Sequence, residues 1–312
     1  MSDTPTRTSE ITSPDTELVE TQTPATTIDT MSDEEIRKLI KSKEVSPLLL
    51  GFQDMWEGLK RFQIWTTFAS EDLQQRYFRA GLGLYWIAIS YAFFLGGYIL
   101  IVGRLAGDGW AEKSCYITIG YLAWLQMNNA VSEGVGTFTM NANWIKAARL
   151  PFSVFAYQAT VRNCLNLAIH AGVTIVVLII FRAGLSPDLT ALEIAYSVGA
   201  MIFIMLNTVW VQIFFGIIAL RYRDIAHFTS AMMRLFFFFT PVLWRANLIG
   251  AYGEIIFTYN PFTYFIQIVR LPLLEARFPA HEWMVVSIIS LCGFLITGIM
   301  LGLTHKKIAF WL

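Results

Sequence analysis

Long apolar runs without charge alternate with short polar segments through most of the chain. A helix needs about 20 apolar residues to cross a hydrocarbon core of about 30 Å. Four segments meet this requirement without a charged residue, although the second is short. They are Ala80–Val102, Cys115–Val131, Ile194–Leu220 and Trp283–Thr304. The pattern predicts a membrane-spanning helix in each.

Two further segments are apolar but interrupted. Pro151–Phe181 is long and contains Arg162 and His170, whereas Ala226–Trp244 contains one arginine near its start and Pro241 near its end. With these two, the sequence predicts an all-α membrane protein with about six transmembrane helices. The composition agrees, because only 15% of the 312 residues are charged, against about 25% in soluble domains.

The N-terminal part of the chain differs from the rest. Residues 1–47 are polar and contain no apolar core, so we expect a largely disordered cytoplasmic tail without a secretory signal. An amphipathic helix follows, and we expect it to lie in the plane of the membrane interface or, alternatively, to pack on a soluble partner. Its apolar positions recur every three or four residues: Leu48, Phe52, Met55, Leu59 and Phe62.

The region between the last two predicted spans, Ala246–Glu282, has apolar runs of only about ten residues, which are too short to span. Glycines, the Asn260-Pro261 pair and Pro272 interrupt it. Backbone at membrane depth must be covered by protein or face water. We therefore predict two short re-entrant helices that enter from the outer side, within Ala246–Glu275.

The positions of Lys and Arg predict the orientation, since these residues are enriched on the cytoplasmic side. With the N-terminus inside, ten lie on inner flanks: Lys60, Arg61, Arg76, Arg79, Lys146, Arg149, Arg221, Arg223, Lys306 and Lys307. Six lie on outer flanks: Arg104, Lys113, Arg182, Arg245, Arg270 and Arg277. This bias predicts that both the N- and C-termini are cytoplasmic.

Several kinds of chemistry are missing from the sequence. The formal net charge is zero, so no basic excess indicates nucleic acid. The chain has no G-x-x-x-x-G-K-[ST] motif, no His/Cys cluster with metal-ligand spacing and few carboxylates in the predicted spans. The chain is therefore expected not to bind ATP through a P-loop and to hold no metal, and the few carboxylates argue against a proton-driven transporter without excluding one.

A set of short motifs follows in a characteristic order. They are Phe68-Ala69-Ser70-Glu71-Asp72-Leu73-Gln74-Gln75-Arg76-Tyr77, Arg221-Tyr222-Arg223-Asp224-Ile225, Phe239-Thr240-Pro241-Val242-Leu243-Trp244, Tyr259-Asn260-Pro261-Phe262 and Lys306-Lys307-Ile308-Ala309-Phe310-Trp311. In this order and spacing, residues 48–312 resemble the membrane (permease) subunit of ABC-2 type ABC transporters. The resemblance is closest to exporters of O-antigen and related bacterial surface polysaccharides. Glu71 departs from the family, which usually has a basic residue there.

The resemblance implies a multi-pass homodimer in the bacterial inner membrane, in contact with membrane lipids and with two separate cytoplasmic ATPase subunits. ATP and Mg would bind to those partners, with no cofactor on this chain. The complex would export a lipid-linked polysaccharide in lipopolysaccharide biosynthesis. The coupling segments would be Asn141–Leu150 and Arg221–Phe228. Their candidate contacts are Trp144, Lys146, Arg149, Arg221, Arg223 and Asp224.

Two alternatives remain at this stage. One is an ABC-2 exporter of a small lipid or drug, although the closing Ile308-Ala309-Phe310-Trp311 favours the polysaccharide branch. The other is a membrane enzyme that acts on a polyprenyl lipid. Such an enzyme would need clustered acidic residues to hold a metal and a diphosphate, and the sequence shows no such cluster.

A polar stripe runs along the third predicted span, because Gln158, Arg162, Asn166 and His170 recur every four residues. An unpaired arginine at this depth costs about 2.5–3.5 kcal/mol on insertion scales, so Arg162 should face a partner or water. We consider an ion pair with Glu133, a water-accessible path for the sugar chain, or a dimer contact. Five aromatic residues are further candidates for that path, at its exit: Tyr252, Phe257, Tyr259, Phe262 and Tyr264.

Overall fold

The computed structural model describes residues 46–77, 83–103, 109–245 and 250–312, and these residues form helices and no strands. The predicted all-α class is therefore confirmed. The predicted N-terminal tail, residues 1–47, lies outside the described residues except for its last two.

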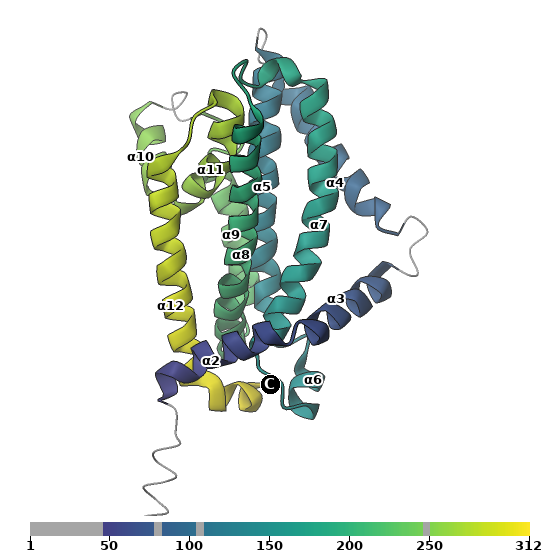
Figure 1. Cartoon of the computed structure of the whole chain (residues 1–312), viewed down its shortest axis with the longest axis vertical. Helices are drawn as coiled ribbons and strands as arrows, with labels where there is room; N and C mark the ends of the chain where they lie inside the picture. The colour runs from purple at the N-terminus through teal and green to yellow at the C-terminus, as the bar shows by residue number, and fades with distance from the viewer. Residues whose placement is uncertain (1–45, 78–82, 104–108, 246–249) are drawn as a thin grey trace, which may run out of the picture. The chain divides into compact units, whose positions relative to one another are not determined.

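Four long helices run side by side through the molecule (Figure 1). They are α5 (Trp110–Gly136), α7 (Ser153–Ile180), α8 (Ala191–Arg221) and α12 (Ala280–Trp311). Within the described ranges, α7, α8 and α12 are long and apolar enough to cross a membrane. The helix α5 has 27 residues and is about 40 Å long, but it contains more polar residues than α7, α8 and α12 and does not meet the same criterion of apolar composition.

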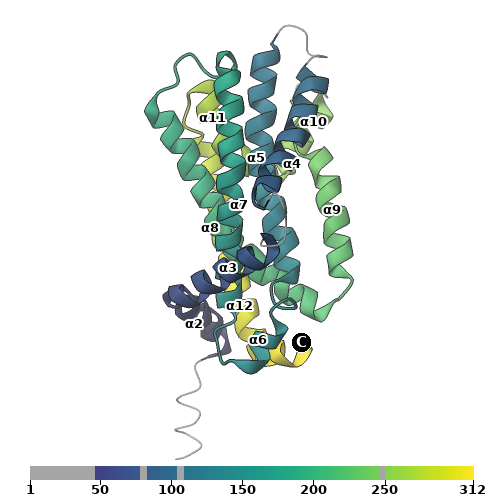
Figure 2. The same cartoon turned by 90° about the vertical axis from the view of Figure 1, so that its right-hand side faces the viewer.

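Two shorter apolar helices correspond to the first and fifth predicted spans. The helix α4 (Tyr85–Tyr98) continues into one π-helical turn, Ile99–Gly103, and α9 (Ile225–Phe239) ends directly before Thr240-Pro241. Figure 2 shows α9 at one side of the bundle, away from α7. The count of six spans stays a prediction, because neither helix reaches the length required by itself.

The predicted interfacial helix is in fact two helices, α2 (Pro47–Lys60) and α3 (Phe62–Tyr77), with a break at Arg61. The backbone N–H of Arg61 bonds to the carbonyl of Gly58 in the last turn of α2, and the two helices then pack on different neighbours. Gly51 of α2 lies against the backbone of Gly298 on α12, where a Cβ atom would clash. The helix α3 instead packs along α7.

The predicted apolar stripe of the amphipathic helix is divided between two environments. Met55 is buried, and Phe52 packs against Gly298. Leu48, Leu59 and Phe62 are exposed, at 50%, 43% and 57%. A location in the membrane interface remains a prediction for this exposed side.

At the end of the bundle opposite α2 are two short helices that follow α9 and precede α12 in the sequence (Figure 1). They are α10 (Ala251–Tyr259) and α11 (Pro261–Glu275). Asn260 caps α11, because its Oδ1 accepts a hydrogen bond from the backbone N–H of Phe262 at 3.0 Å, and Pro261 fits the first helical position. Two short helices were predicted here; their re-entrant character stays a prediction.

Candidate functional site

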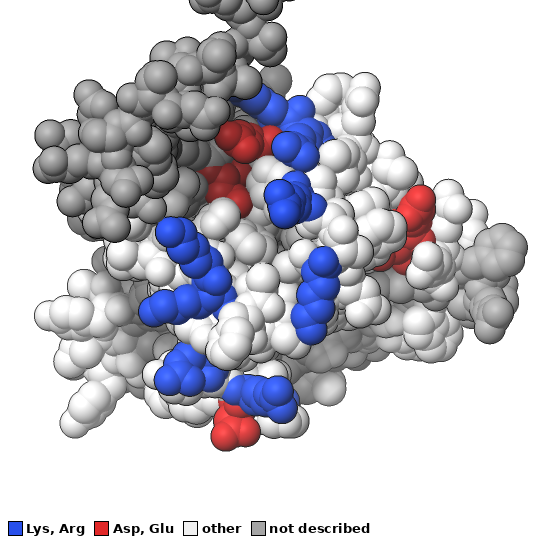
Figure 3. Space-filling view, turned by 90° about the horizontal axis from the view of Figure 1, so that it is seen from below, with Lys and Arg blue, Asp and Glu red and all other residues white. Residues whose placement is uncertain are grey.

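The end of the bundle that carries α2 also carries the short helix α6 (Ala142–Ala147), the turn between α8 and α9, and the C-terminus (Figure 1). We call this the lower end. All six predicted coupling residues are exposed there: Trp144, Lys146, Arg149, Arg221, Arg223 and Asp224. Figure 3 shows Lys and Arg side chains spread over this face, with few carboxylates among them. The two predicted coupling segments thus share one accessible basic face.

Asp54 of α2 contacts two other helices at the lower end. Its carboxylate is 5% exposed and accepts hydrogen bonds from the backbone N–H groups of Phe152 and Ser153, at 2.9 and 2.8 Å. A carboxylate at a helix N-terminus satisfies unpaired donors and interacts favourably with the helix dipole. The Ser153 hydroxyl donates back to the Asp54 carbonyl, and His305 Nε2 of α12 lies 3.3 Å from Asp54 Oδ2. Asp54 therefore links α2, α7 and α12.

Arg162 lies on α7 between two carboxylates. Its Nη1 is 2.7 Å from Asp72 Oδ2, and its Nη2 is 3.0 Å from Glu133 Oε2. The contact with Glu133 that the sequence suggested is present. The second contact, with Asp72 of α3, was not anticipated. Arg162 is only 6% exposed. The two carboxylates compensate its buried charge within one copy of the chain.

Of the other stripe residues, Gln158 and His170 contact neighbouring helices of the same chain, whereas Oδ1 of the half-buried Asn166 has no hydrogen-bond partner among the described residues. Gln158 donates a hydrogen bond from Nε2 to Asp72 Oδ2 at 2.7 Å. One turn beyond Asn166, His170 is buried, with its ring centroid 4.7 Å from that of Tyr91 on α4. Only Arg162 of the stripe lines the neighbouring polar pocket of about 250 Å³, together with Asp72, Glu133 and residues of the α5–α6 turn.

The five aromatic candidates for the exit do not form one surface. Tyr252 and Tyr259 on α10 are exposed, at 77% and 83%. Phe262 is half-buried against Trp124 and Phe236, with ring centroids 5.3 and 5.5 Å away. The remaining two are also half-buried: Phe257, and Tyr264, whose hydroxyl donates to the carbonyl of Thr258. Only the two α10 tyrosines are freely accessible.

Arg270 corrects one assumption of the orientation argument, which counted it as an outer flanking charge. It lies on α11 and is 1% exposed. Its Nη1 donates to the Pro241 carbonyl at 2.9 Å, and its Nη2 donates to the Val242 carbonyl at 3.3 Å. Its guanidinium carbon lies 3.6 Å from the ring centroid of Tyr116 on α5. Without Arg270, the count is ten inner against five outer Lys and Arg residues, so the bias towards the inner side remains.

Sequence patterns do not indicate the contacts of Asp72, Asp54 and Arg270. Asp72 is part of a motif quoted above, but nothing in its spacing indicates a contact 90 residues along the chain. Asp54 and Arg270 alternate with apolar residues, as ordinary surface charges of amphipathic helices do. Among the described residues no cluster of His, Cys, Asp and Glu could hold a metal ion.

Known proteins resemble the chain over most of its length, although no family model matches it. Two O-antigen export system permease proteins, both RfbA of Klebsiella pneumoniae, are 24% and 25% identical over 247 and 249 residues. Each match covers 78% of this chain and 92% of the relative. The O-antigen export system permease protein RfbA of Myxococcus xanthus is 20% identical and covers 68% and 80%. The resemblance to O-antigen export permeases predicted from the motifs is confirmed.

Proposed function

We propose that this chain is the membrane-spanning subunit of an ATP-driven exporter that moves a lipid-linked polysaccharide, such as O-antigen, out of the cytoplasm. The observation that carries the proposal is similarity to O-antigen export permeases over 92% of the length of two of them. The long apolar helices agree with a membrane location. In this proposal the chain works as a dimer in the inner membrane and is not itself an enzyme.

Energy would come from two separate ATPase subunits that bind ATP and Mg. The lower end supports this partnership, because an exposed Trp144 and exposed basic residues from two segments lie on one accessible face. Exposed aromatic and arginine side chains are enriched in protein interfaces. The lower end then faces the cytoplasm, and the C-terminus lies on that side.

Gene deletion tests the exported substrate. Removing the chain should abolish the surface polysaccharide and accumulate its lipid-linked form inside the cell, and the wild-type gene should restore display. A deletion strain with unchanged surface polysaccharide but altered resistance to drugs would contradict the proposal and favour a small-molecule exporter.

Asp224→Ala tests the coupling face. Asp224 is exposed at the start of α9 and its side chain makes no capping hydrogen bond, so its loss should not affect folding. We expect unchanged amounts of membrane protein but weaker ATPase co-purification or less export per ATP hydrolysed. Asp188→Ala is the matched control, because Asp188 is exposed between α7 and α8, at the opposite end. Equal assembly and export in both variants would remove Asp224 from the interface.

Orientation is tested with single cysteines on a cysteine-free background and an impermeant thiol reagent in intact cells. Position 188, in the α7–α8 loop, and position 254, on α10, are exposed at the end opposite the lower end and should react. Position 146, on α6, and position 223, in the α8–α9 turn, lie at the lower end and should not. The reverse pattern would invert the proposed topology.

For the polar stripe, the contacts favour a structural role of Arg162 over the two alternatives, a water-accessible path and a dimer contact. Both carboxylates that it meets belong to its own chain. The exposed α10 tyrosines, Tyr252 and Tyr259, are the candidates we retain for contact with the sugar chain. Their replacement by alanine should lower export and leave the amount of protein unchanged.

A further inference from the structure

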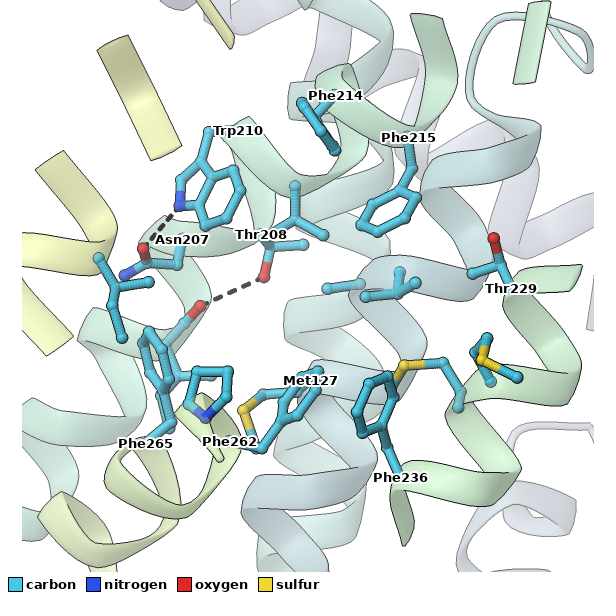
Figure 4. A pocket seen from close by; sticks show the side chains of 18 of the residues that line it. Met127, Asn207, Thr208, Trp210, Phe214, Phe215, Thr229, Phe236, Phe262 and Phe265 are labelled. Atoms are coloured by element: carbon cyan, nitrogen blue, oxygen red, sulfur yellow. Dashed lines mark hydrogen bonds between the residues drawn. The ribbon is translucent and has the colours of Figure 1, made fainter. Parts of the chain in front are cut away.

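An apolar pocket of about 510 Å³ lies between α5, α8, α9 and α11. Its volume falls in the range of about 300–1,000 Å³ typical of ligand sites. Figure 4 shows the rings of Phe215, Phe236 and Phe262 around the open space. Methionines on two walls, Met127 on α5 and Met232 on α9, add flexible apolar surface that adapts to ligands of irregular shape.

The polar side chains at this pocket are largely satisfied by their own helix. Asn207 Oδ1 accepts from Trp210 Nε1 at 2.6 Å, and Asn207 Nδ2 donates to the carbonyl of Phe203 at 2.8 Å. The Thr208 hydroxyl points back to the carbonyl of Ile204. None of the described residues that line the pocket is charged. Water requires two to four polar partners, so an apolar ligand fits this space better than water.

Residues that line the pocket on α8 and α9 extend over several helical turns. Its lining residues on α8 run from Ile204 to Phe215, about 16 Å of helix, and those on α9 run from Phe228 to Phe236, about 12 Å. The helix α8 is long and apolar enough to span a bilayer, and an α8 that spans it would set these lining residues along the membrane normal. Lipid hydrocarbon chains lie in that same direction.

We propose that this pocket binds one hydrocarbon chain of a lipid, inserted between α9 and the α5–α8 pair. The hydrocarbon chain provides the van der Waals contacts that the apolar walls of the empty pocket lack. The proposal goes beyond polysaccharide export, because it requires only that α8 spans the membrane. Two lipids can supply such a chain, a membrane phospholipid or the polyprenyl carrier of the exported sugar.

Photolabelling of the full-length protein in nanodiscs tests this site. The probe is phosphatidylglycerol with a diazirine in its acyl chain, diluted into unlabelled phosphatidylethanolamine and phosphatidylglycerol. Peptide mass spectrometry should find the label concentrated on Met232, Met233 and Phe236. The reference positions are Leu291 and Leu295 on α12, which are 63% and 46% exposed and do not line the pocket.

Pocket-filling variants show whether the label reports the pocket. Val131→Phe places a ring in it and should lower labelling of α9 about tenfold, which corresponds to about 1.4 kcal/mol of lost binding. Val198→Phe is the matched control, because Val198 is 54% exposed outside the pocket. Ala130→Leu fills the same space with fewer added atoms and carries the test if Val131→Phe does not fold. Gel filtration and the melting temperature establish folding.

The outcomes are distinct. Displacement of the label by polyprenyl phosphate identifies the carrier tail, and displacement only by excess phosphatidylglycerol identifies a resident phospholipid; both support the site. Label on α9 no stronger than on Leu291, or unchanged in both filling variants, overturns it. Labelling uses no ATP and no polysaccharide, so a negative result leaves the proposed export function standing.

Discussion

Two arginines are buried in the described part of the chain, and they are held in different ways. Arg162 lies between two carboxylates, Asp72 and Glu133. The described residues give Arg270 no carboxylate; two backbone carbonyls and the face of Tyr116 surround it instead. Both side chains are almost fully removed from solvent, at 6% and 1% exposure.

The comparison shows how surroundings determine what a buried charge does for stability. Removing one member of a buried ion group leaves uncompensated charge behind, which is strongly destabilising. Removing a cation held by neutral groups leaves only unpaired dipoles, and it also removes the cost of burying the charge. The Arg162 group should therefore be the more sensitive of the two, although Arg270 is the more deeply buried.

Arg162→Met should have the largest effect. It leaves Asp72 and Glu133 close together without a cation, at a cost of about 3 kcal/mol, the lower end of the range for broken buried pairs. The lower end applies because the two carboxylate side chains are 34% and 20% exposed. Thermal unfolding in a mild detergent measures the loss. A melting temperature equal to that of the wild type would show that the group contributes nothing.

Neutralising the whole group should recover much of that loss. The triple variant Asp72→Asn, Glu133→Gln, Arg162→Met buries no net charge, and neutral replacements of buried ion groups are often as stable as the original. We expect it to melt above Arg162→Met by several degrees, corresponding to about 1–2 kcal/mol. If the triple variant is less stable than the single one, hydrogen bonding rather than charge dominates the group.

Arg270→Met should lower the free energy of unfolding by a smaller amount, about 1–2 kcal/mol. Two carbonyls lose their donors, but the cost of burying the charge also disappears. Tyr116 sharpens the test. Tyr116→Leu removes the ring below the guanidinium and should cost about 1 kcal/mol more than Tyr116→Phe, which keeps the ring. A loss for Arg270→Met larger than for Arg162→Met would contradict the comparison.

Asp54→Asn should have the smallest effect, about 0.5 kcal/mol. Asparagine keeps one acceptor for the first turn of α7 but loses the negative charge at that helix N-terminus. Asp54→Ala removes both acceptors and should cost about 1 kcal/mol more. Equal melting temperatures for the two variants would show that the acceptor kept by asparagine does not stabilise the protein.

The sequence was sufficient to predict the helical class and the order of the apolar helices, because 3.6-residue periodicity and long apolar runs are local signals. It also suggested the Glu133–Arg162 contact, because an arginine in an apolar segment needs a partner. The break at Arg61 and the contacts of Asp72 and Arg270 could not be predicted. They depend on which helices are neighbours, and no local pattern encodes that.

The order of these contacts along the chain also bears on how the protein is made. Each buried arginine follows its partners in the sequence, and those partners are Asp72 and Glu133 for Arg162, and Tyr116, Pro241 and Val242 for Arg270. A ribosome synthesises the N-terminal part first. Every group that receives an arginine has therefore left the ribosome before that arginine does. A circular permutant that begins at α7 would reverse this order for Arg162 and present its charge to the membrane ahead of both carboxylates.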